Sequence, residues 1–204
     1  MKTGRPLRVL VAGGGTGGHL FPGIALAGEL ISRDPNNRVL FVGTGKPFER
    51  SALGAAGFEG RAIDVAGLKR RGFRNQAVAL AKLPGALAAS ARIIRKFRPH
   101  LVIGVGGYSA GPVAAAARMA SIPVVLHEQN MLPGITNRTL APLAKRIYVS
   151  FGGTRIPGKY ADRVRVFGNP VRAEVLEEGQ RDRGTEGQRG NGLSLTVAVL
   201  GGSQ

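Results

Sequence analysis

The stretch Gly13-Gly14-Gly15-Thr16-Gly17-Gly18-His19 follows the apolar run Leu7 to Ala12 and precedes a helix-like pattern over Pro22 to Ser32. The apolar run predicts a strand, so the glycines lie between a strand and a helix. A loop of this kind lets backbone N–H groups approach a phosphate, and the helix N-terminus adds partial positive charge. The stretch therefore predicts a diphosphate cradle.

The spacing of Gly13, Gly15 and Gly18 also satisfies the GxGxxG pattern of dinucleotide sites. That pattern further requires an acid about 20 residues later, at the end of the second strand, to hold the ribose. The expected strand Arg38 to Val42 is followed by Gly-Thr-Gly-Lys, without an acid. A nicotinamide or flavin cofactor is therefore disfavoured. A glycine turn that only allows close packing explains one or two of these glycines, but not five.

Composition restricts the remaining function classes. The 204 residues carry 29 Lys and Arg against 12 acids, a formal charge of +17 that attracts anionic partners. Trp is absent and only three Tyr occur, without alternation of basic and aromatic residues, so a nucleic-acid partner is not expected. Cys is absent, which excludes thiolate metal sites and cysteine nucleophiles. No apolar stretch approaches the roughly 18 residues that span a bilayer, and we expect a soluble or peripheral protein.

Short β-branched runs alternate with Ala- and Leu-rich stretches, which predicts βαβ units and an α/β fold with a parallel sheet. The expected strands are Leu7 to Ala12, Arg38 to Val42, Arg61 to Val65, Leu101 to Val105, Val124 to Leu126, Arg146 to Val149 and Val164 to Phe167. The expected helices are Pro22 to Ser32, Phe48 to Ala56, Ala77 to Phe97, Gly111 to Ala120 and Gly134 to Leu143.

Two further loops follow expected strands. Gly104 to Pro112 (GVGGYSAGP) is a second glycine loop before a helix, and His127 to Asn130 (HEQN) is a run of four polar residues. Because ligands bind at the carboxyl ends of parallel strands, all three loops are expected at one site. Each polar residue could instead be a hydrogen-bonded loop anchor.

The last part of the chain changes character. Residues Glu177 to Gly192 are almost without apolar side chains, which predicts a surface insertion or linker. Leu193 to Leu200 again predicts a strand, and Gly201-Gly202-Ser203-Gln204 follows it. We expect the chain to stop at the start of a second domain.

With GGGTGGH, GVGGYSAGP, HEQN, Gly168-Asn169-Pro170-Val171-Arg172 and the final Gly-Gly-Ser-Gln in order, the chain resembles the MurG family. These bacterial transferases add N-acetylglucosamine (GlcNAc) from UDP-GlcNAc to undecaprenyl-pyrophosphoryl-MurNAc-pentapeptide in peptidoglycan synthesis. The resemblance implies a GT-B fold, in which two domains, each with a doubly wound parallel sheet, face each other across a cleft. Residues 1–168 would form the acceptor and membrane-facing domain. Residues 169–204 would hold a linker, the insertion and the first strand and glycine loop of a truncated donor-binding domain, so this chain is expected to be inactive alone.

The resemblance also implies roles for individual residues in an inverting transfer that needs no cofactor or metal. The muramyl 4-hydroxyl would attack the anomeric carbon while UDP leaves, with His19 as first candidate for the base. Its alternatives are to hold the glycine loop or to bind phosphate as a cation, and Glu128 is the runner-up, as base or as a group that orients a neighbour. Donor contacts are expected from Thr16, Gly17, Gly18, Asn130, Arg172 and Ser203, and acceptor-diphosphate contacts from Gly14, Gly15, Gly106, Gly107, Tyr108 and Ser109.

Basic and apolar residues are mixed at one further place, which carries Leu68, Lys69, Arg70, Arg71, Phe73, Arg74, Leu83 and Leu87. Such a pattern suits an anionic membrane surface, although a solvated loop leading into a core-facing helix has the same composition. The resemblance favours the membrane and implies a peripheral protein on the cytoplasmic side of the cell membrane. Cell-wall synthesis proteins are further expected partners. The alternatives are a GT-B transferase for another lipid acceptor and a precursor-binding half of a bipartite enzyme.

Overall fold

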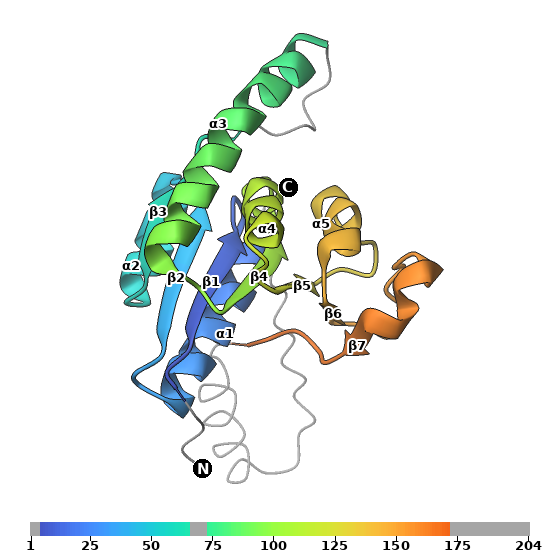
Figure 1. Ribbon diagram of the computed structural model, residues 1–204. Helices are drawn as coiled ribbons and strands as arrows, with labels where there is room; N and C mark the ends of the chain where they lie inside the picture. The colour runs from blue at the N-terminus through green and yellow to red at the C-terminus, as the bar shows by residue number, and fades with distance from the viewer. Residues whose placement is uncertain (1–4, 66–72, 172–204) are drawn as a thin grey trace, which may run out of the picture.

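The computed structural model describes residues 5–65 and 73–171, which form one parallel sheet covered by helices on both faces (Figure 1). Its seven strands lie in the order β3-β2-β1-β4-β5-β6-β7. The strands are β1 (Arg8–Gly13), β2 (Arg38–Gly43), β3 (Glu59–Ala62), β4 (Leu101–Gly106), β5 (Val124–Glu128), β6 (Arg146–Val149) and β7 (Val164–Val166). The helices are α1 (Gly17–Arg33), α2 (Pro47–Ala55), α3 (Phe73–Phe97), α4 (Ala110–Met119) and α5 (Ile135–Leu140), with 3-10 turns η1 (Ala141–Leu143) and η2 (Gly158–Arg163).

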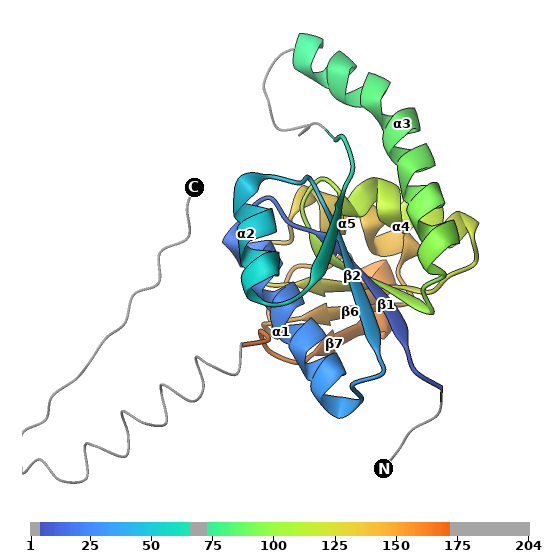
Figure 2. The same ribbon diagram turned by 90° about the vertical axis from the view of Figure 1, so that its left-hand side faces the viewer.

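Alternate side chains of the central strands enter two separate cores. Val9 and Val11 of β1 pack with α1 and α2 on one face, whereas Leu10 and Ala12 pack with α3, α4 and α5 on the other. Figure 2 shows the two groups of helices on opposite sides of the sheet. Because successive strand residues point to opposite faces, a strand segment buried on both faces must be apolar, as Val9 to Ala12 is.

The order of the strands places the ends of β1 and β4 side by side. The chain moves outward from β1 through β2 to β3 and then returns to β4 on the other side of β1. The helices that follow these neighbours, α1 and α4, lie on opposite faces, so the carboxyl ends of β1 and β4 form a topological switch point, where ligands bind in open α/β sheets. We refer to this switch point and the two loops around it as the crevice. The first turns of α3 extend beyond the sheet at this same edge (Figure 1).

The predicted α/β class and parallel sheet are confirmed, but several boundaries differ. The strand expected at Arg61 to Val65 is β3, two residues earlier at its start, because it is an exposed edge strand whose pairing with β2 does not follow its apolar residues. The helix expected from Pro22 begins at Gly17, and the one expected from Ala77 begins at Phe73. The helix expected over Gly134 to Leu143 is divided into α5 and η1.

The difference at β5 affects the site directly. The strand was expected to end at Leu126, with four polar residues after it, but it continues through His127 and Glu128. Both side chains are buried, at 4% and 1% exposure. They therefore lie inside the protein, where their polar groups need internal partners.

Candidate functional site

The two glycine loops contact each other through their backbones. The N–H of Gly14 donates to the carbonyl of Gly106 at 3.3 Å. A Cβ on Gly13 would overlap that same carbonyl oxygen, and a Cβ on Gly107 would overlap the carbonyl oxygen of Gly14. These glycines are therefore explained by packing of one loop on the other.

Two other glycines of the first loop are not packed in this way. Leaving aside its chain neighbours and the backbone of α1, a Cβ on Gly15 or Gly18 would meet no atom of the described residues within 4 Å. Within the described part of the chain, no group accepts a hydrogen bond from the N–H of Thr16, Gly17 or Gly18. Because the first N–H groups of a helix lack intrahelical partners, the start of α1 presents donors at this loop.

A carboxylate that the sequence reading missed fixes the first loop from the side. Glu49, in the first turn of α2, is 3% exposed. One of its oxygens accepts hydrogen bonds from the N–H of Gly15 at 2.6 Å and the hydroxyl of Thr44 at 2.8 Å. The other accepts from the N–H groups of Thr44 and Gly45 at 2.8 and 2.7 Å. An acid in the first turn of a helix was the available signal, but it is also common at helix starts in general.

These bonds bear on two of the residues predicted to bind the acceptor diphosphate. The N–H of Gly14 donates to the Gly106 carbonyl and the N–H of Gly15 donates to Glu49, so neither is available to a ligand in this arrangement. Glu49 also stands near the end of β2, where a dinucleotide site would need an acid. Its carboxylate is already saturated by the loop, so it does not restore a ribose site.

His19 lies between the two glycine loops. Its ring covers Gly106 so closely that a Cβ there would be 2.7 Å from Cδ2 and 2.9 Å from Nε2. Its Nδ1 is 3.1 Å from the hydroxyl oxygen of Thr16, which stands just before α1. The predicted base is thus placed at the crevice, beside the first N–H groups of α1.

Glu128 has a carboxylate whose two oxygens each accept two hydrogen bonds. One accepts from the backbone and side-chain N–H groups of Asn130 at 2.9 and 3.0 Å. The other accepts from the N–H of Gly134 at 3.0 Å and the side chain of Asn137 at 2.9 Å. This geometry favours the orienting role for Glu128 over the role of a base, and it fixes Asn130 at the rim of the site.

His127 connects β5 to the point where the chain leaves the sheet. Its Nδ1 is 3.0 Å from Nε2 of Gln129, and its Nε2 is 3.4 Å from the carbonyl oxygen of Gly168. The Gln129 amide also donates to the carbonyl of Val105 at 3.1 Å. Since an amide nitrogen only donates, Nδ1 accepts and the ring proton lies on Nε2, toward Gly168. Burial lowers the pKa of His127, opposed by the Gly168 carbonyl and the charge of Glu128.

Four buried side-chain oxygen atoms have no hydrogen-bond partner within the described residues. They are Oγ of Ser109, at the start of α4, Oε1 of Gln129, Oδ1 of Asn137 and Oγ of Ser150. Buried polar atoms are nearly always paired, and the first two of these atoms lie in the loops that follow β4 and β5.

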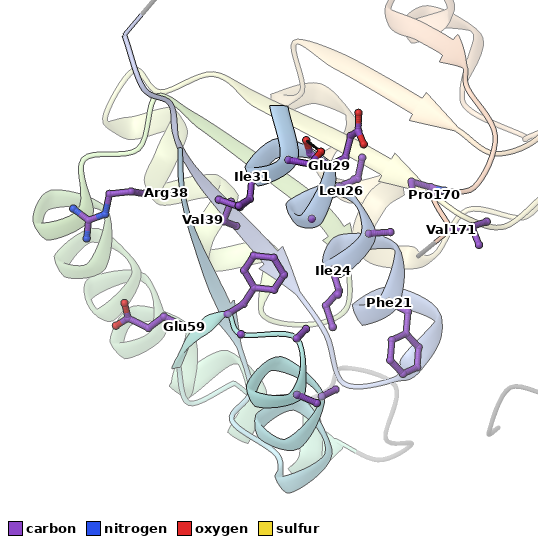
Figure 3. A pocket seen from close by; sticks show the side chains of 18 of the residues that line it. Phe21, Ile24, Leu26, Glu29, Ile31, Arg38, Val39, Glu59, Pro170 and Val171 are labelled. Carbon is purple, nitrogen blue, oxygen red and sulfur yellow. Dashed lines mark hydrogen bonds between the residues drawn. The ribbon is translucent and has the colours of Figure 1, made fainter. Parts of the chain in front are cut away.

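An apolar groove of about 910 Å³ opens beside the second glycine loop, between α3, α4 and α5. Tyr108, predicted to contact diphosphate, is 37% exposed and lines it, as do Leu83 and Leu87 of the predicted membrane patch. A larger cavity of about 1170 Å³ lies between α1, α2 and the segment with Pro170 and Val171 (Figure 3). It contains neither glycine loop, so we do not place the chemistry there.

Other predicted residues are outside the described part of the chain: Arg172, Ser203, Leu68, Lys69, Arg70 and Arg71. For Phe73 and Arg74 only their place in α3 is described. Among the described residues, no group of three or more His, Asp or Glu could hold a metal ion, and no helix is long and apolar enough to cross a membrane.

Comparison with known proteins identifies the family. Residues 9–149 match the N-terminal domain of glycosyltransferase family 28. The chain belongs to this family. Curated relatives include transferases from Syntrophus aciditrophicus (46% identical) and Geobacter sulfurreducens (43%), each matched over 97% of this chain and 53% of the relative. Both are named UDP-N-acetylglucosamine--N-acetylmuramyl-(pentapeptide) pyrophosphoryl-undecaprenol N-acetylglucosamine transferase. The chain spans about half the length of these relatives.

Solved structures agree with this identification. MurG from Acinetobacter baumannii is 29% identical, with a TM-score of 0.68 over 84% of this chain and 47% of that one. A UDP-GlcNAc 2-epimerase from Neisseria meningitidis, 14% identical with a TM-score of 0.60, shares the fold alone and is matched over 89% of this chain and 52% of that one. The resemblance to the MurG family and the GT-B-type α/β fold are thus confirmed. The family match contains the glycine loops and the HEQN segment, so the crevice lies within the glycosyltransferase domain.

The buried His127 predicts a pH dependence of stability in this family 28 domain. Its folded-state pKa is lowered by burial, whereas in the unfolded chain it titrates near the usual value of about 6.5. The unfolded state therefore binds a proton first, and stability is lost as pH falls from about 7 through the folded-state pKa. Urea unfolding of the wild type and of His127→Gln at several pH values measures this loss. We expect a shallower fall in His127→Gln; equal slopes would contradict the assignment.

Proposed function

We propose that this chain supplies the acceptor half of an inverting glycosyltransferase. The reaction is transfer of GlcNAc from UDP-GlcNAc to the 4-hydroxyl of undecaprenyl-pyrophosphoryl-MurNAc-pentapeptide. The observation that carries the proposal is 43–46% identity over 97% of the chain to relatives named for this transfer. The crevice supports it, because it combines helix N–H donors, a histidine and an adjoining apolar groove.

His19 is proposed as the base that removes the proton of the attacking hydroxyl. A neutral imidazole can accept this proton at the ring nitrogen that carries no hydrogen. When Nδ1 carries the hydrogen and donates to Thr16 Oγ1, Nε2 is the basic nitrogen. Thr16 would then set the tautomer in addition to its predicted contact with the donor. Arg172 and Ser203 keep their predicted roles at the leaving diphosphate, which a guanidinium and a hydroxyl suit chemically.

The remaining predicted contacts divide between the two substrates. Gly107, Tyr108 and Ser109 at the start of α4 would hold the acceptor diphosphate, and the apolar groove would take the first part of its lipid. Gly14, Gly15 and Gly106 would shape this site rather than donate to it. Thr16, Gly17, Gly18 and Asn130 would face the donor, whose other contacts we assign to a second domain beginning near residue 169.

Transfer of radiolabelled GlcNAc to a short-chain analogue of the lipid acceptor tests this proposal. We would use the 204 residues continued by the part of the Syntrophus relative that they do not match. Substitution His19→Ala should lower kcat by 10²- to 10⁴-fold, roughly the contribution of a general base, with a much smaller change in donor KM. The helix variant Gly28→Ala, away from the crevice, is the matched control. Near-normal kcat in His19→Ala would remove it from this role, and transfer only to other lipid acceptors would indicate a different family 28 enzyme.

The same proposal places the protein peripherally on an anionic membrane, on its cytoplasmic side. Leu80 and Leu83, in the first half of α3, are exposed and line the apolar groove. Helix α3 begins at Phe73, within the basic stretch 68–74. Each basic residue near an anionic leaflet contributes about 1 kcal/mol, and apolar insertion adds to this.

Binding to vesicles that contain phosphatidylglycerol tests the docking surface. Replacing Lys69, Arg70, Arg71 and Arg74 by Gln should weaken binding at low salt by at least about tenfold. The control replaces four arginines by Gln at or near the amino edge of the sheet, at the ends of helices or the start of β2: Arg33, Arg38, Arg95 and Arg118. Equal loss in both variants would show that net charge, and not this surface, decides binding.

A further inference from the structure

Glu49 connects the first glycine loop to the loop that follows β2. Its four hydrogen bonds join Gly15 on one side to Thr44 and Gly45 on the other. A Cβ on Gly14 would lie 2.8 Å from the carboxylate, so that glycine leaves room for it. The Gly15 N–H thus donates to a carboxylate of the protein itself and is not available to a phosphate.

This bond controls how the chain enters α1. Gly15 has a backbone φ of +90°, which residues other than glycine rarely adopt. Its N–H donates to Glu49 Oε1 at 2.6 Å. The next residue, Thr16, precedes α1, and its hydroxyl contacts His19. A change at Gly15 would therefore move the first N–H groups of α1 and the histidine together.

We propose that Glu49 is a positioning residue for the proposed transferase site. By holding Gly15, it directs the N–H groups of Thr16, Gly17 and Gly18 toward a substrate diphosphate and confines anion binding to the start of α1. The inference rests on the proposed function for the identity of the substrate, but the diphosphate chemistry does not depend on it.

Glu49→Gln separates this role from a general loss of structure. The amide keeps one oxygen, which can still accept from the N–H groups of Thr44 and Gly45, while its NH₂ can donate to the Thr44 hydroxyl. Only the Gly15 N–H then faces a donor and loses its acceptor. The variant thus disconnects the first glycine loop while it preserves the loop after β2.

The direction of the change in anion affinity distinguishes a positioning role of Glu49 from a purely electrostatic one. Removing a negative charge beside an anion site should strengthen anion binding by simple attraction. Loss of a positioned loop should weaken it. The two roles therefore predict opposite changes in the same variant.

Inorganic pyrophosphate titrated into the 204-residue chain provides the test, followed through the backbone amide resonances. In the wild type we expect shifts at Thr16, Gly17 and Gly18. In Glu49→Gln we expect at least tenfold weaker binding and faster hydrogen exchange at Gly15. Unchanged or tighter binding in the variant, or no response of these three amides in the wild type, would overturn the proposal.

Two further variants control for the loss of a carboxylate charge and for general disruption of the loop after β2. Glu29→Gln removes an exposed carboxylate of α1 that pairs with Arg33, so it should retain wild-type pyrophosphate binding. Thr44→Val removes one hydroxyl donor to Glu49 but keeps the Gly15 bond, so its affinity should fall less than threefold. An equal loss in Thr44→Val and Glu49→Gln would show that the whole loop fails together and would contradict a specific role for Gly15. If pyrophosphate binds as expected but no GlcNAc is transferred, the proposed function fails and this inference stands.

Discussion

The backbone contact between the loops after β1 and β4 is the constraint on which the site depends. Gly14 donates to the Gly106 carbonyl, and side chains on Gly13 or Gly107 would overlap the opposing backbone. The contact is a consequence of topology, because β4 returns to the sheet beside β1 and their helices cover opposite faces. It also decides where His19 lies, since the ring packs over Gly106. The packing of the two loops and the position of the proposed base therefore depend on the same contact at Gly106.

Two buried carboxylates fix the loops around this contact. Glu49 holds the first glycine loop and Glu128 holds the segment after β5, each through four hydrogen bonds from neighbouring groups. Hydrogen bonds to charged acceptors are stronger than neutral ones, so each carboxylate stabilises the conformation of the loop that it holds. Acidic residues in this crevice thus hold the loops in shape, while the donors at the start of α1 are left to face a ligand.

Much of the fold could be predicted from the sequence, because β1 and β4 contain apolar runs that are buried on both faces of the sheet. The edge strand β3 was misplaced because its residues are exposed and carry no such pattern. The glycine loops and the HEQN segment were recognisable by composition and order. The role of Glu49 was not, since it arises from a contact between residues 34 positions apart in the chain. Likewise, nothing in the sequence indicated that His127 would reach the carbonyl of Gly168.

The most direct test of the central claim is a crystal structure of this chain, continued by the second half of the Syntrophus relative, with a short-chain acceptor analogue and UDP bound. The account predicts the acceptor diphosphate at the start of α4 and UDP facing the start of α1. It places the prenyl chain in the groove between α3, α4 and α5, and the muramyl 4-hydroxyl within hydrogen-bond distance of His19 Nε2. An acceptor bound in the cavity between α1 and α2, with His19 remote from the 4-hydroxyl, would contradict it.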